Sequence, residues 1–172
     1  MRNGQIIDLR ERRRRRHLPV GRTLHLVDLE NLAGGSAASR VEIDIALDGY
    51  EHAVRFGAGD HRVVACGKGL VFPAKDRWPG ADVRYARGLD GADRLLLRAA
   101  DPDDVAARFD RVVIGSGDHI FGELAIELDR RSVGVCVASR RSALSRRLHQ
   151  VAPVVCFIND DGNVRDAIAM TA

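Results

Sequence analysis

The sequence predicts an α/β fold, a three-layer α/β/α sandwich with a mainly parallel central sheet. Short apolar runs, typical of buried strands, alternate along the chain with segments whose apolar residues have helical spacing. The runs are apolar on both faces, which is typical of parallel strands covered by helices on each side. A chain of 172 residues can bury one continuous core, so a single folded domain is expected.

Six apolar runs are predicted to be strands, namely residues 23–29, 61–66, 82–86, 111–115, 133–138 and 154–158. Helical spacing predicts helices over residues 39–56, 91–100, 120–131 and 142–151. A further short helix is expected to begin at Asp101, as its N-cap, with Pro102 in the first position. Between the second and third strands, Pro73 and Pro79 predict a loop.

The positive charge is concentrated at the amino terminus. Residues 1–22 contain eight arginines and two acidic residues, a net charge of +6, whereas the whole chain carries +3, so the remainder carries −3. An unbroken basic run is formed by Arg12, Arg13, Arg14, Arg15 and Arg16. Its self-repulsion opposes packing and favours a flexible arm able to lie along phosphates, although a solvated extension or an upstream start codon would look the same. We therefore expect a flexible arm (1–22), a folded domain (23–158) and a C-terminal tail (159–172).

The composition indicates a protein of a reducing compartment. No apolar stretch approaches the roughly 20 residues that a membrane-spanning helix needs, and the arginine-rich start lacks the apolar segment of a secretory signal. We expect a cytoplasmic protein without a membrane partner. Cys66, Cys136 and Cys156 lie in apolar runs without a CxxC or paired-histidine spacing, which predicts buried free thiols and not a zinc site.

Three carboxylates stand where an apolar run gives way to a turn or helix. Asp28 closes the first predicted strand, Asp93 follows the third and Asp118 follows the fourth. Because the carboxyl ends of parallel strands meet at one crevice, these side chains are expected to lie close together and to hold Mg²⁺ or Mn²⁺. Asn31, three residues after Asp28, could hydrogen-bond a phosphate oxygen or hold Asp28 in place.

These residues resemble the signature motifs of NYN domains, members of the PIN-like nuclease superfamily. The resemblance rests on residues 28–31 (DLEN), 91–93 (GAD) and 115–121 (GSGDHIF), and extends in the same order over residues 23–158. It implies a PIN-like sandwich and a divalent-metal-dependent endoribonuclease that hydrolyses RNA phosphodiester bonds. It assigns metal ligation to Asp28, Asp93 and Asp118, with Asn31 as the accompanying amide.

The sequence departs from that family pattern at two positions. Many members place further acids where this chain has Ile120 and Ala99. The departures motivate an alternative, a catalytically weak or inactive PIN-like RNA-binding module. Neither Glu30 nor Glu123 is expected to replace the missing acids, because Glu30 is expected to point away from Asp28 if the first strand persists, and Glu123 lies more than one helical turn from Asp118.

Candidate phosphate-binding residues surround the predicted crevice, namely Ser116, Arg140, Arg141, Arg146 and Arg147. The arginines would attract a polyanion to an acidic centre, and a solvated helix face is the competing interpretation. Ser116 would cap the following helix or touch phosphate. A homo-oligomer is compatible with the sequence.

Other α/β functions fit less well. A dinucleotide fingerprint after residue 115 fails because Ile120 stands where the third glycine belongs. A hydrolase elbow fails because Ile114 and Asp118 flank Ser116 where glycines are required. A receiver domain would need adjacent acids after the first strand and a late lysine, and a haloacid-dehalogenase phosphatase would need a second Asp at Glu30.

Overall fold

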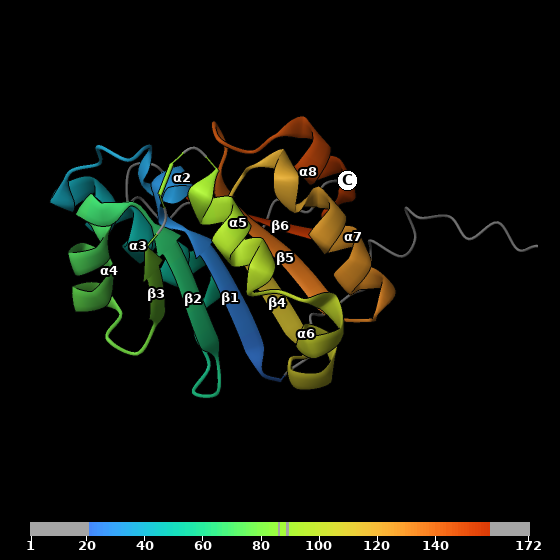
Figure 1. The fold of residues 1–172 in the computed structure, drawn as a ribbon. Coiled ribbons are helices and arrows are strands. Elements are labelled where there is room, and N and C mark those ends of the chain that lie inside the picture. Colours follow the sequence, from blue (N-terminus) through green and yellow to red (C-terminus); the bar gives the residue numbers. More distant parts are fainter. Residues whose placement is uncertain (1–20, 86, 89, 159–172) are drawn as a thin grey trace, which may run out of the picture.

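The computed structural model describes residues 21–85, 87–88 and 90–158, which form an α/β sandwich (Figure 1). Its centre is a six-stranded sheet in which every strand pairing is parallel. The strands are β1 (Thr23–Asp28), β2 (His61–Cys66), β3 (Asp82–Tyr85), β4 (Arg111–Gly115), β5 (Gly134–Arg140) and β6 (Val154–Ile158). The predicted fold class and all six predicted strands are confirmed, with Ala86 outside the described residues.

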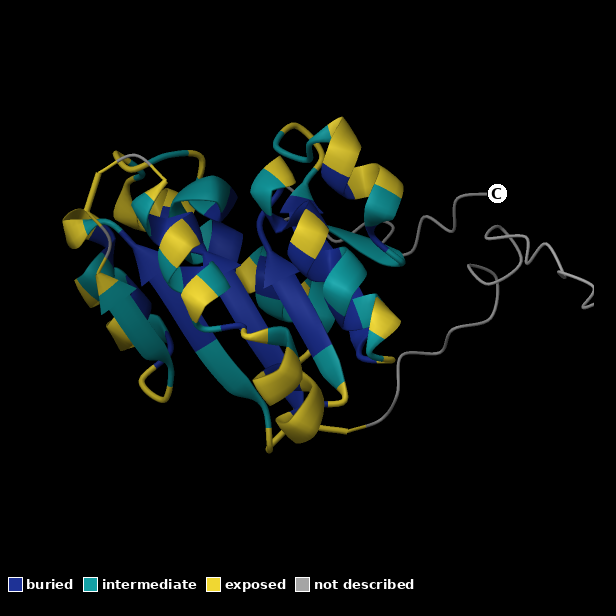
Figure 2. Ribbon diagram, turned by 45° about the vertical axis from the view of Figure 1, so that its right-hand side comes forward, coloured by how far each residue is buried: buried dark blue, intermediate teal, exposed yellow. Residues whose placement is uncertain are grey.

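Helices cover both faces of the sheet. One face carries α2 (Leu29–Ala33), α3 (Arg40–Val54) and α4 (Val71–Arg77), and the other carries α5 (Gly91–Arg98), α6 (Pro102–Arg108), α7 (Gly122–Arg130) and α8 (Arg146–Val151). Each face therefore has its own apolar cluster, and the four central strands are buried along most of their length, whereas the edge strands β3 and β6 are mostly half-buried (Figure 2). Burial on both faces explains why the strands are continuous apolar runs.

The strand order is β3-β2-β1-β4-β5-β6, so the chain leaves β1 in one direction and returns to its other side with β4. In sheets of this kind, a crevice opens at the carboxyl ends of the two strands where the order reverses. Here those strands are β1 and β4. Helices α2 and α5 begin at the same end of the sheet, at the top of Figure 1.

Two predicted segments differ from the structure. The expected loop after β2 is wrong, because a 3-10 turn (Lys68–Leu70) and helix α4 occupy it. Pro73 is tolerated because it lies in the first turn of α4, where backbone N–H groups have no partner within the helix. The helix predicted over residues 142–151 begins only at Arg146, because the side chain of Ser145 caps its amino end by accepting from Leu148 N.

Strand β1 also ends earlier than predicted, and this changes the site. Asp28 is the N-cap of α2, so Leu29 and the residues after it are helical and not extended. Gly34 ends this short helix in the left-handed conformation, with φ of 96°, which glycine adopts without steric cost. The sequence has a suitable residue at each end of α2, an aspartate at its N-cap and a glycine after its last residue. The helix itself has only five residues, too few for helical spacing of apolar residues to be recognised.

A buried polar network holds the middle of β1. The Nδ1 atom of His25 lies 2.9 Å from the Tyr50 hydroxyl and its Nε2 atom lies 3.2 Å from Asp60 Oδ2. Since an ionised Asp60 only accepts, Nε2–H donates to it and Nδ1 accepts from Tyr50. Burial, opposed by the contact with Asp60, lowers the pKa of His25 to about 4. The sequence offered no partner for His25, and the structure supplies two.

The remaining sequence expectations have mixed outcomes. Cys66 and Cys136 are buried free thiols as predicted, whereas Cys156 is half-buried. No helix in the described part of the chain is long and apolar enough to cross a membrane. The arginine run at 12–16 and the tail at 159–172 lie outside the described residues.

Candidate functional site

Asp28 stands at the end of β1, on the face of the sheet that α5 covers. Along β1, Leu24 and Leu26 face the same apolar cluster as α5, and strand alternation gives Asp28 the same side. Its Oδ1 accepts from the backbone N–H of Asn31 at 3.2 Å, and the Ser116 hydroxyl lies 3.4 Å from its Oδ2. Burial is the main reason that the pKa of Asp28 rises to about 7.

Asp93 lies in the first turn of α5 and meets Asp28 across the crevice. Each of these residues is 7 % exposed, and the two carboxyl groups are close enough that each affects the pKa of the other. Burial, and next the negative charge of Asp118, raise the pKa of Asp93. Its Oδ1 is buried without a hydrogen-bond partner among the described residues. Two buried carboxyl groups are therefore held together with one oxygen unsatisfied.

Asp118 follows β4 and is more exposed than the other two acids. It caps a 3-10 turn (His119–Phe121): its Oδ1 accepts from Ile120 N at 3.0 Å and lies 2.8 Å from Nδ1 of the exposed His119. Its own N–H donates to the Ser116 hydroxyl at 3.2 Å. Ser116 is fully buried between Asp118 and Asp28, a placement that favours a positioning role over direct contact with phosphate.

Asn31 links α2 to the turn after β4 and to the end of β5. Its side-chain Oδ1 accepts from Gly117 N at 2.9 Å, and its backbone carbonyl accepts from the Arg140 guanidinium at 3.0 Å. A Cβ atom on Gly117 would lie 2.2 Å from the carbonyl oxygen of Ala143, so only glycine fits there. Asn31 contacts Asp28 through its backbone N–H and not through its side-chain amide, and the contact of the amide with a phosphate oxygen stays a prediction.

Glu30 lines the same cavity as Asp28, contrary to the expectation that it points away from Asp28. Because α2 begins at Leu29, Glu30 turns back toward Asp28, whose pKa its charge helps to raise. Its Oε1 accepts from Gly67 N at 3.1 Å, and a Cβ on Gly67 would lie 2.5 Å from that oxygen. Glu123 lies elsewhere, on the exposed surface of α7, where it pairs with Arg147 at 2.6 Å.

The positions at which the family pattern has further acids are used for packing. Ile120 and Ala99 both pack against the apolar cluster beneath α5 and α7. Hydrophobic burial, not ligand binding, accounts for these two side chains.

A cavity of about 610 Å³ opens over the paired acids. Its lining includes Asp28, Asp93, Glu30, Asn31 and Asp90. This cavity collects acids that are distant in sequence, as the strand-end pattern predicted, but it is not lined by Asp118.

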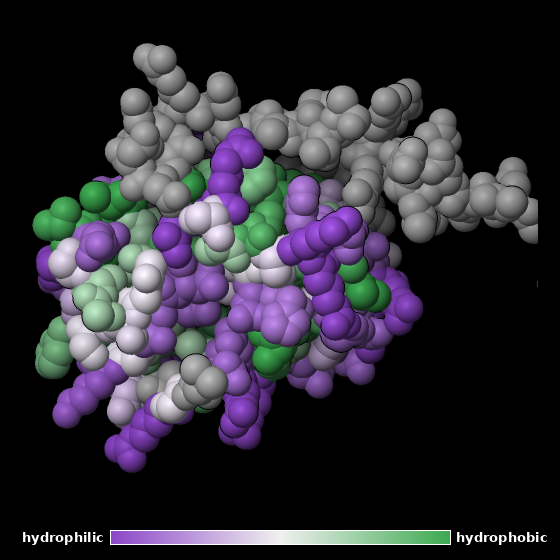
Figure 3. All heavy atoms as spheres, turned by 90° about the horizontal axis from the view of Figure 1, so that it is seen from above, coloured by the Kyte–Doolittle hydropathy of each residue, from purple (hydrophilic) through white to green (hydrophobic). Residues whose placement is uncertain are grey.

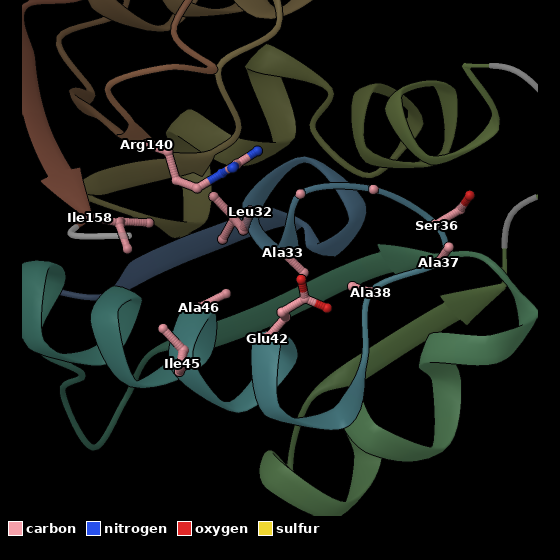
Figure 4. A pocket seen from close by; sticks show the side chains of 12 residues that line it. Leu32, Ala33, Ser36, Ala37, Ala38, Glu42, Ile45, Ala46, Arg140 and Ile158 are labelled. Carbon is pink, nitrogen blue, oxygen red and sulfur yellow. The ribbon is translucent and has the colours of Figure 1, made fainter. Parts of the chain in front are cut away.

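A second cavity, of about 600 Å³, lies beside it between α2 and α3 (Figure 4). Leu32, Ile45 and Ile158 give it apolar walls, and Glu42 and Arg140 contribute charged groups. The two cavities share Arg140 and the glycine-rich turn at residues 34–36. No role is predicted for that turn from the sequence, although two adjacent glycines are typical of backbone that approaches a ligand.

The other candidate arginines lie further out. Arg141 stacks on the ring of Phe157 with 4.0 Å between the guanidinium carbon and the ring centroid, and Arg146 and Arg147 are exposed on α8. Viewed from the carboxyl ends of the strands, hydrophilic side chains occupy much of the visible described surface (Figure 3).

The donor set fits one hard cation better than a closed cage. In the described part of the chain, no group of three or more His, Cys, Asp or Glu side chains is placed to hold a metal ion together. The buried pair Asp28 and Asp93, with its unsatisfied oxygen, nevertheless has the chemistry that Mg²⁺ and Mn²⁺ prefer, since these ions often take one or two carboxylates and complete their coordination with water and phosphate.

Comparison with known proteins adds no family assignment: neither a protein-family model nor a curated protein matches this sequence. The fold and the arrangement of the crevice are therefore the basis for a functional conclusion.

Proposed function

We propose that this protein is a divalent-metal-dependent endoribonuclease that hydrolyses RNA phosphodiester bonds, as the resemblance to NYN domains implies. The observation that carries the proposal is that Asp28, at the carboxyl end of β1, and Asp93, in α5, line one cavity, with Asp93 Oδ1 buried and without a hydrogen-bond partner among the described residues. Buried carboxyl groups are normally paired with a cation or fully hydrogen-bonded. Asp93 Oδ1 lacks such a partner among the described residues, and a bound cation would provide one.

Asp28 and Asp93 would hold the cation, and Asp118 would reach it through water or through a rearrangement of the turn that it caps. A divalent cation at this place would neutralise a phosphate and lower the pKa of a bound water. Ser116 and Asn31 would act as positioning residues, because their hydrogen bonds fix Asp28 and the turn after β4. Arg140 would contact phosphate, since it lines both cavities.

Cleavage of a labelled single-stranded RNA by the full chain tests the proposal. We expect cleavage that requires Mg²⁺ or Mn²⁺, is lost in chelator, and falls about 10- to 100-fold in Asp118→Asn, the scale of loss seen when groups around a metal are removed. Glu123→Gln is a matched control, because Glu123 is an acid after the same strand that lies outside the crevice. Robust cleavage in chelator would contradict the proposal.

The alternative is an RNA-binding module with little or no turnover. It is favoured by the apolar packing of Ile120 and Ala99 and by the lack of a three-acid group in the described residues. It predicts salt-sensitive RNA binding that survives Asp118→Asn and weakens when residues 1–22 are deleted. Metal-dependent cleavage by highly purified protein, lost in Asp118→Asn, would exclude it.

A further inference from the structure

Two cysteines that are distant in sequence meet on the face of the sheet that α3 covers. Cys136 lies in β5 and Cys156 in the edge strand β6. Their Sγ atoms are 3.3 Å apart, and both side chains belong to the apolar cluster of α2, α3 and α4. A disulfide needs about 2.0 Å between the sulfurs, so a displacement of little more than an ångström would join them.

The two thiols have different surroundings. Cys136 is 2 % exposed, whereas Cys156 is half-buried on a strand that has a sheet neighbour on one side only. Either sulfur can donate in this contact, and a hydrogen bond donated by the thiol of the buried Cys136 lowers the pKa of Cys156 and raises that of Cys136. The positive charge of Arg111 favours the thiolate of both. A partly accessible, activated sulfur beside a buried resolving thiol is the arrangement of redox-sensitive cysteines.

We propose that Cys136 and Cys156 form a reversible intramolecular disulfide when the protein meets a hydroperoxide. The Cys156 thiolate attacks the peroxide O–O bond, becoming a sulfenic acid and releasing hydroxide from hydrogen peroxide. The sulfur of Cys136 then attacks that of Cys156, the S–O bond breaks, and the proton of Cys136 leaves with the oxygen as water. In total, two thiols lose two electrons and the peroxide is reduced to two molecules of water.

The bond would tie the edge strand to β5 and close the chain between residues 136 and 156. That segment contains Arg140, Arg141, Arg146 and Arg147. A cross-link of this kind restricts the unfolded chain and is expected to stabilise the fold. The inference concerns cysteine chemistry alone and does not depend on the proposed ribonuclease activity.

Peptide mapping of the oxidised full chain tests the proposal. The reduced protein is treated with hydrogen peroxide, remaining thiols are alkylated in denaturant, and the digest is read by mass spectrometry without reduction. We expect a peptide pair joined through Cys136 and Cys156, so that one of the three cysteines remains titratable. We also expect a higher melting temperature that dithiothreitol reverses.

The third cysteine provides the matched control. Burial raises the pKa of Cys66 to about 11, and its strand is remote from β6 in the sheet, so Cys66→Ala should retain the cross-link. Cys156→Ala should abolish it. Oxidation of Cys156 to sulfinic acid with Cys136 still titratable, or a dimer linked through Cys156, would overturn the proposal; both are read on the unmutated protein.

Discussion

Strand β1 carries two buried polar side chains, His25 and Asp28, and they differ in how completely they are satisfied. Both ring nitrogens of His25 have a partner, and Asp60 is itself held by Gly57 N and Thr23 N. Asp28 instead lies near a second carboxyl group, Asp93, one oxygen of which has no hydrogen-bond partner in the part of the chain that the structure describes. The two side chains point to opposite faces of the sheet, so one strand serves two separate polar clusters.

This difference separates a structural cluster from a candidate site. A fully hydrogen-bonded buried network stabilises one arrangement of the chain, whereas a partly satisfied one costs stability unless a ligand completes it. The His25 cluster is complete without a ligand. The pair Asp28 and Asp93 has the character of a site kept at the expense of stability, as active sites often are.

Removing one acid from the pair should have the largest effect on activity. If Asp93 helps to hold the cation, Asp93→Asn should lower RNA cleavage at least about 100-fold, measured as initial rates at saturating Mn²⁺. Asp90→Asn is the control: Asp90 lines the same cavity, is exposed, makes no capping hydrogen bond, and has a left-handed backbone that asparagine tolerates. An equal loss of cleavage in Asp93→Asn and Asp90→Asn would contradict the assignment of the cation to the buried pair Asp28 and Asp93.

Lowering the pH should destabilise the folded protein through the buried His25. Because the folded-state pKa of His25 is about 4 against 6.5 in the unfolded chain, only the unfolded chain gains this proton between these pH values. Stability should fall as the pH drops through that window, by on the order of 3 kcal/mol. Asp60 does not add to the change in stability between pH 4 and 6.5. Its pKa is lowered in the folded protein, so its stabilising effect is lost only as the pH falls below the ordinary value of 3.8.

Urea unfolding at stepped pH measures this dependence, with His25→Gln as the comparison. The experiment belongs in an Asp28→Asn background, since the raised pKa of Asp28 gives an opposite slope between 3.8 and about 7. If His25→Gln shows the same slope as its parent, His25 is not the titrating group.

Neutralising Asp28 should stabilise the metal-free protein. Asp28→Asn keeps the shape of the side chain and removes a buried charge, so the free energy of unfolding at pH 7.5 in chelator should rise by about 1–2 kcal/mol. The same substitution at Asp60 should destabilise, because Asp60 accepts hydrogen bonds from His25, Thr23 and Gly57. A lower free energy of unfolding in Asp28→Asn would show that Asp28 stabilises the fold, as Asp60 does, and would contradict this prediction.

The smallest effects are expected at the outer arginines. Arg147→Ala should weaken RNA binding less than tenfold and reduce the slope of log affinity against log salt by about 1, as for one phosphate contact. Arg140→Ala should weaken binding more, because Arg140 lines both cavities and donates to the carbonyl of Asn31. Fluorescence anisotropy over a salt series distinguishes the two variants, and the reverse ranking would argue against the crevice as the RNA site.

The sequence by itself determined the layers of this protein and the edge at which its acids gather. Period and apolar burial are local properties, so β1, β4 and the other strands could be recognised from short windows. The positions of Asp28 and Asp93 at strand and helix ends followed from the same windows, and the structure brings these two together.

Only the tertiary structure decided which side chains touch. It turned Glu30 into the crevice through a five-residue helix, placed Ile120 and Ala99 in the apolar cluster, and left Asp118 at the margin of the acid pair. It also brought His25 into contact with Asp60, and Cys136 into contact with Cys156. No pattern in the sequence near these residues indicates either pair. Contacts between residues far apart in the chain depend on strand order and packing, and a sequence window contains neither.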